Sequence, residues 1–145
     1  MVSTEHLLGD IRSLIENARG RVAQTVNAEL VFLHWQIGER IRKSVLHEGR
    51  AEYGKQIVEA LSKQLTVEYG RGFTRDALLR MVQFSESFPD AKIVATLSQQ
   101  LGWSHFVELI AMEDSLKREF YAEMCRIERW SVRTLRLKIQ GMLYE

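Results

Sequence analysis

Proline is nearly absent from this chain, since Pro89 is the only one in 145 residues. Proline breaks helices because it lacks a backbone N–H, so long stretches here are free of strong helix breakers. Apolar residues recur at steps of three and four, and no segment shows the alternation typical of a strand. With 46% apolar residues the chain can bury one sizeable core. We expect a single all-α, multi-helix domain over residues 1–145.

The first third of the chain carries the longest helical pattern. Apolar residues run at helical spacing from Leu7 to Ile41. Gly20 is the expected break, because glycine costs about 1 kcal/mol in a helix interior. The sequence therefore predicts two long helices, over residues 4–18 and 21–47. Gly38 lies inside the second, which indicates either close packing by another helix or a tolerated surface glycine.

A helix-turn-helix-like segment is predicted over residues 54–88, after a polar connection at 47–53. Gly54 opens one helical pattern, and glycines at 70 and 72 mark a tight turn. Thr74 can cap the next helix, because its hydroxyl can accept from backbone amides of the first turn. Further helices are expected over residues 90–143, with a bend at Trp130 and Ser131.

This layout is one by which proteins place a second helix in the DNA major groove. Arg71 lies in the turn, and Arg75, Arg80 and Gln83 fall on the expected solvent face. Arginines suit phosphates and guanine edges, and glutamine suits adenine edges. The sequence therefore nominates these four residues for DNA binding.

The charge balance leaves an alternative open. Asp76 and Glu86 share that face, and a mixed-charge amphipathic helix is common on any helical domain. Twenty Lys and Arg against nineteen Asp and Glu leave a net charge of +1, so any basic surface must be local.

Two other segments carry weaker signals for nucleic-acid binding. Residues 94–111 match the order of a compact helix-turn-helix, but Glu108 on its second helix favours a plain helical corner. Near the C-terminus, four arginines recur at steps of three, four and three, with Lys138 nearby: Arg126, Arg129, Arg133 and Arg136. The bend expected at Trp130 and Ser131 would interrupt this row.

Apolar residues on expected surfaces support a second hypothesis, a protein–protein interaction or dimerisation module that binds no DNA. Trp35 and the apolar seam from Val22 to Ile41 could pair with another subunit. Leu137 and Tyr144 lie opposite the buried side of the last helix, which indicates a docking surface.

No pattern in the sequence nominates a catalytic site, a metal or another cofactor. The chain lacks a phosphate-binding loop, and its four histidines show no metal-ligand spacing: His6, His34, His47 and His105. Pro89, Asp90 and Lys92 spell part of a nuclease signature, but capping by Asp90 at a helix start explains them better. We expect no enzyme activity and no small-molecule substrate.

The remaining signals concern the compartment. A single cysteine, Cys125, cannot form an intramolecular disulfide, which is typical of a reducing setting. No apolar run reaches 18 residues, and the first ten residues do not resemble a signal peptide. We expect a cytoplasmic protein with no membrane partner.

Five strings, taken in order, carry a family resemblance: LHWQIGERI from Leu33, YGKQIVEALSKQL from Tyr53, GFTRDALLRMVQF from Gly72, LGWSHFVELI from Leu101 and REFYAEMCRIERWSVRTLRLKIQGMLYE from Arg118. Over roughly residues 10–145 the chain resembles the helical N-terminal domain of the YhcG-like family of bacterial PD-(D/E)XK nucleases.

The resemblance implies a helix-turn-helix module that precedes a C-terminal nuclease domain. It offers residues 72–84, with Arg75 and Arg80, as the DNA-facing segment. The sequence stops at Glu145, so we expect the nuclease domain to be absent and carry over no catalytic residue. The resulting prediction is a non-catalytic DNA-binding module that would accompany a nuclease domain.

Overall fold

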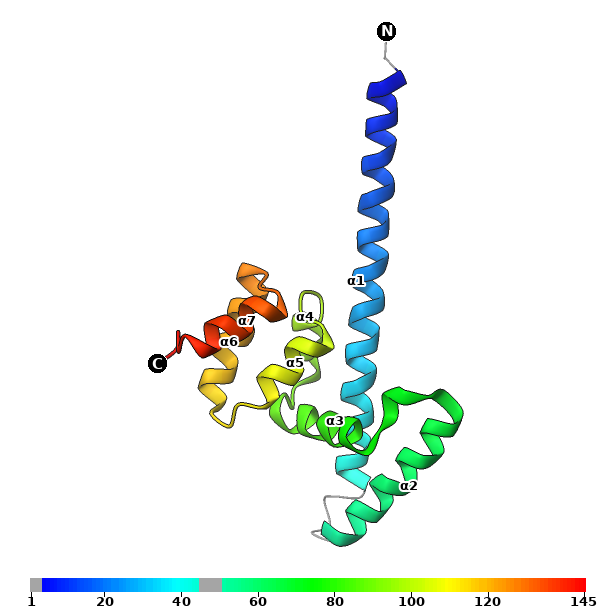
Figure 1. Ribbon diagram of the computed structural model, residues 1–145, viewed down its shortest axis with the longest axis vertical. Helices are drawn as coiled ribbons and strands as arrows, with labels where there is room; N and C mark the ends of the chain where they lie inside the picture. Colours follow the sequence, from blue (N-terminus) through cyan, green and yellow to red (C-terminus); the bar gives the residue numbers. More distant parts are fainter. Residues whose placement is uncertain (1–3, 45–50) are drawn as a thin grey trace.

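The computed structural model describes residues 4–44 and 51–145. Within these ranges the chain forms seven α-helices, one 3-10 turn and no strand, which confirms the all-α prediction (Figure 1). The elements are α1 (Thr4–Ser44), α2 (Ala51–Tyr69), η2 (Arg71–Phe73), α3 (Arg75–Ser87), α4 (Ala91–Leu97), α5 (Trp103–Ile110), α6 (Ser115–Glu128) and α7 (Val132–Gln140). Positions 45–50, in the expected helix end and polar connection, lie outside the described residues.

The predicted break at Gly20 is wrong, because α1 runs through it as one helix of 41 residues. A glycine costs about 1 kcal/mol, whereas ending one helix and starting another leaves four unpaired backbone groups at each new end. At 1.5 Å per residue α1 is about 60 Å long. Figure 1 shows its N-terminal half projecting beyond the other helices.

The main core packs against the C-terminal half of α1. Trp35 is only 5% exposed, and its indole Nε1 donates to the carbonyl of Phe88 at 2.7 Å. Rings from α3 and α5 stack beside it, with the centroids of Phe84 and Phe106 4.6 Å apart. Other fully buried members come from five helices and the corner between α4 and α5: Val31, Val94, Leu101, Leu109, Tyr121 and Leu135.

A second core cluster joins α1, α2 and α3: Ile41, Val58, Leu78, Met81 and Val82. The helices α1 and α3 cross at Gly38, where an added Cβ would lie 1.8 Å from the carbonyl oxygen of Met81. Of the two interpretations of this glycine, close packing by another helix is therefore the correct one.

Residues 98–102, between α4 and α5, form a helical corner fixed to α1. The side-chain amide of Asn27 donates to the carbonyls of Ser98 and Leu101, both at 3.1 Å, and Gln24 donates to the carbonyl of Gln99. His105 joins this corner to the C-terminal helices, since its Nδ1 accepts from the Gly102 amide and its Nε2 lies 2.7 Å from the Trp130 carbonyl. This corner orients α5, α6 and α7 relative to α1.

Candidate nucleic-acid interface

Local contacts fix the turn between α2 and α3. Gly70 ends α2 with a positive φ of 93°, a conformation that favours glycine. The hydroxyl of Ser62 in α2 donates to the Phe73 carbonyl at 2.8 Å. Thr74 caps α3 as predicted, because its side-chain oxygen accepts from the amide of Ala77 at 3.1 Å. The turn therefore holds Arg71 and the start of α3 in one relative position.

The helix α3 buries one side and exposes the other. Leu78, Met81 and Phe84 are buried against α1 and α5, whereas Arg75 and Arg80 are exposed. Asp76, Gln83 and Glu86 are exposed as well, so the mixed charge expected from the sequence is present.

The two arginines of α3 flank its exposed side. Arg80 follows Arg75 by five positions, which places the two side chains about 140° apart around the helix axis. Arg71 is also exposed and precedes α3 in the turn. Together they present positive charge at the turn and along both edges of the exposed side.

The arginines in this segment differ in their pairing from two of the four C-terminal arginines, Arg126 and Arg136, but not from Arg129 and Arg133. Within the described residues, no carboxylate forms an ion pair with Arg71, Arg75 or Arg80. Arg126 instead pairs with Glu123, and Arg136 pairs with Glu108 at 2.7 Å. Pairing with Arg126 lowers the pKa of the Glu123 carboxyl.

Structural features also interrupt the C-terminal arginine row. Arg129 ends α6 in the left-handed region at φ 54°, and Ser131 caps α7, so the predicted bend is confirmed. Lys138 lies over the Trp130 ring, 5.6 Å from its centroid. The row is therefore divided between two helices, and two of its four arginines form ion pairs with carboxylates of the same chain.

The side-chain amide of Gln83 is not free, because it forms a hydrogen bond within the chain. Its Nε2 donates to the carbonyl of Ile110 at 2.8 Å, which ties α3 to the last residue of α5. A contact with an adenine edge would first require this hydrogen bond to break. We therefore leave Gln83 out of the candidate interface.

Asp90 is a helix cap, as the sequence indicates. Its carboxylate accepts from the amide of Lys92 at 2.9 Å at the start of α4.

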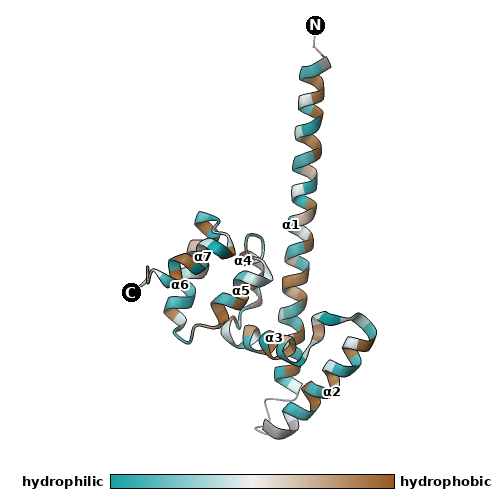
Figure 2. Cartoon of the chain, in the orientation of Figure 1, coloured by the Kyte–Doolittle hydropathy of each residue, from teal (hydrophilic) through white to brown (hydrophobic). Residues whose placement is uncertain are grey.

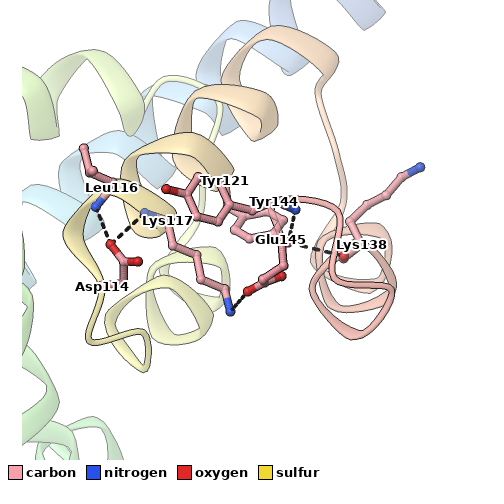
Figure 3. A network of polar contacts seen from close by, with 7 residues as sticks. All are labelled: Asp114, Leu116, Lys117, Tyr121, Lys138, Tyr144 and Glu145. Carbon is pink, nitrogen blue, oxygen red and sulfur yellow. Dashed lines mark hydrogen bonds and ion pairs between the residues drawn. The ribbon is translucent and has the colours of Figure 1, made fainter.

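The three residues expected on an interaction surface have different environments. Trp35 belongs to the core and is not available to a partner. Leu137 is 59% exposed, and Tyr144 is 38% exposed with its ring 5.4 Å from that of Phe120. Figure 3 shows the tail folded back along α6, where the Tyr144 amide donates to the hydroxyl of Tyr121 at 3.2 Å.

A longer apolar surface lies on α1, nearer the N-terminus than the predicted seam from Val22 to Ile41. Part of the expected seam is internal, since Val31 and Ile41 are buried. The exposed apolar residues instead begin at Leu7 and continue to Leu33. Helical periodicity was the available signal, but it does not distinguish burial within a chain from burial against a partner.

These features define an all-α module with a projecting N-terminal helix and an arginine-bearing turn between two packed helices. The chain belongs to the DUF1016 N-terminal domain family, which matches residues 10–145. It is 32% identical over 162 residues to "Putative nuclease YhcG" of Escherichia coli (strain K12), an alignment that covers 91% of this chain and 43% of that protein.

The chain thus spans less than half the length of this curated relative. No solved structure matches the chain. In the described part, none of the helices is both long enough and apolar enough to cross a membrane.

Proposed function

We propose that this chain is a non-catalytic module that contacts DNA through Arg71, Arg75 and Arg80 and accompanies a nuclease domain. The observation that carries the proposal is that these three exposed arginines are unpaired within the described residues, beside a turn held by Gly70, Ser62 and Thr74. The relative named as a nuclease supports nucleic acid as the partner.

The chemistry of the surface fits phosphate binding better than base reading. A guanidinium group can donate two parallel hydrogen bonds to a phosphate, and each such contact releases counterions from the duplex. Asp76 and Glu86 repel the same backbone, which limits affinity. We therefore expect micromolar binding with weak sequence preference and a steep dependence on salt.

Fluorescence anisotropy of labelled duplex and branched DNA tests the proposal. The decisive variant is Arg75→Ala/Arg80→Ala, which removes two positive charges from exposed positions without a hydrogen bond to the rest of the described chain. The matched control is Arg126→Ala/Arg136→Ala, which removes the same charge from arginines paired with Glu123 and Glu108. Both variants should fold, because exposed side chains rarely contribute more than about 1 kcal/mol to stability.

We expect the α3 variant to weaken binding about tenfold or more and the control to bind nearly as the parent does. Equal binding by the parent and the α3 variant would remove α3 from the interface. If both variants weakened DNA binding equally, the affinity would depend on total charge, which would contradict the assignment of Arg75 and Arg80 to the interface.

A further inference from the structure

One side of α1, along the projecting half and into the half that packs on the core, carries apolar side chains that remain substantially exposed. Nine of them are between 44% and 68% exposed, and we call them the α1 stripe: Leu7, Leu8, Ile11, Leu14, Ile15, Val22, Val26, Leu30 and Leu33. Figure 2 shows brown, hydrophobic segments recurring along α1, including the part that projects beyond the other helices. Large contiguous apolar patches of this kind mark interaction sites on monomeric proteins.

The stripe occupies one side of the helix, and the core of this chain uses the other. At 100° per residue, the nine positions centre on a direction roughly opposite to that of Val31, Trp35 and Gly38, which pack against α3 and the core. The two surfaces do not compete. A partner can therefore cover the stripe without displacing any helix of the chain.

A lone projecting helix gains little stability from its own backbone. Helices in water owe most of their stability to packing of an apolar side, and Gly9 and Gly20 further weaken this one. The positions of both glycines are open, with no atom within 4 Å of an added Cβ. A partner that packs on the stripe would supply the missing stabilisation.

We propose that the partner is a second copy of this chain, whose α1 stripe packs antiparallel against the first. In a register that places Leu8 beside Val22 of the other copy, the six stripe residues from Leu7 to Val22 face each other. At on the order of 80 Å² for each side chain, each copy buries roughly 500 Å², so the pair buries about 1,000 Å², the size of a weak, reversible interface.

The charges beside the stripe set the orientation. Asp10 lies toward its N-terminal end, with Arg12 close by, and Arg21 lies toward its middle. The antiparallel register that places Leu8 beside Val22 of the other copy also places Asp10 beside Arg21. Parallel packing would place like charges at the same level, which costs stability.

The same charges disfavour a lipid surface as the partner. Residues 4–22 hold three acidic and three basic residues, whereas helices that lie on anionic membranes are rich in Lys and Arg. The charge balance therefore favours a protein surface of the same composition.

Sedimentation across micromolar concentrations tests the pairing. The variant Leu14→Glu/Ile15→Glu places two charges in the middle of the stripe at exposed positions, and Ser13→Glu/Asn17→Glu places the same charges on the opposite side of α1 as the control. We expect a dimer for the parent and control, and a dissociation constant at least about 100-fold higher for the stripe variant.

A monomer for the parent at every concentration would overturn the proposal, as would equal dimerisation by the stripe variant. Binding of the monomer to anionic vesicles, lost in the stripe variant, would assign the stripe to a membrane surface instead. DNA binding by the monomer would still leave the proposed function intact, because the two assays report on different surfaces.

Disulfide trapping tests the orientation. Single variants Leu8→Cys and Val22→Cys, mixed and oxidised, should form the mixed disulfide faster than either self-disulfide, because antiparallel helices bring position 8 of one copy near position 22 of the other. Burial raises the pKa of Cys125 to about 12, so the native thiol stays largely unreactive. Preferential self-disulfides of Leu8→Cys would overturn the antiparallel arrangement.

Discussion

Gly38 of α1 lies so close to Met81 of α3 that an added Cβ would be 1.8 Å from the Met81 carbonyl oxygen. Both partners in this contact are backbone, so neither can yield by rotating a side chain. The crossing sets how α3, with Arg75 and Arg80, lies on the long helix. It also joins the two core clusters, because Trp35 and Ile41 lie one turn to either side of Gly38.

Gly38→Ala should therefore destabilise the fold by about 3 kcal/mol, since the two helices must separate to admit a methyl group. Gly20→Ala is the matched control, because nothing lies within 4 Å of its added Cβ. It should stabilise helix by about 0.5–1 kcal/mol. Urea unfolding followed by circular dichroism measures both, and a parent-like Gly38→Ala would contradict this crossing geometry.

The all-α class, the turn at 70–74 and the helix caps could be predicted from the sequence, because they depend on local chemistry. Thr74, Asp90 and Ser131 each act within three residues of themselves. The continuity of α1 could not be predicted from Gly20 alone, since a glycine penalty is small beside the cost of two helix ends.

The roles of Trp35 and Gln83 could not be predicted for a different reason. Both engage residues 27 or more positions away in sequence, at Phe88 and Ile110. Periodicity places a side chain on a side of a helix, but the partner on that side is set by the tertiary fold. The same limit explains why the exposed stripe begins nearer the N-terminus than the predicted seam.

Trp35→Phe should cost about 1–3 kcal/mol, because it leaves the buried Phe88 carbonyl without the indole donor. Trp103→Phe removes a similar part of a ring from a partly buried site where, within the described residues, the indole donates no hydrogen bond. Comparing the two free energies of unfolding separates the hydrogen bond from lost packing. A larger loss for Trp103→Phe would contradict this role for Trp35.

His34 should make stability depend on pH. Burial lowers its pKa below the usual 6.5, and its Nδ1 is buried with no hydrogen-bond partner in the described part of the chain. As pH falls below about 6.5, the unfolded state takes up a proton that the folded state resists, so stability falls until the lower folded pKa is passed. Above that range His34 is neutral in both states.

The variant His34→Phe keeps a ring beside Trp103, whose centroid lies 4.6 Å from that of His34. Urea midpoints measured at about pH 7.5 and about pH 5.5 should converge for this variant more than for the parent. An unchanged pH dependence in the variant would show that other groups cause it.

The salt dependence of DNA binding tests the central claim most directly. On B-DNA each phosphate contact contributes about 0.9 to the slope of log K against log salt. Arg75→Ala/Arg80→Ala should therefore make the slope shallower by about 2, whereas Arg126→Ala/Arg136→Ala should leave it nearly unchanged. Identical slopes for the parent and the α3 variant would contradict the account, because they would show that these two arginines contact no phosphate.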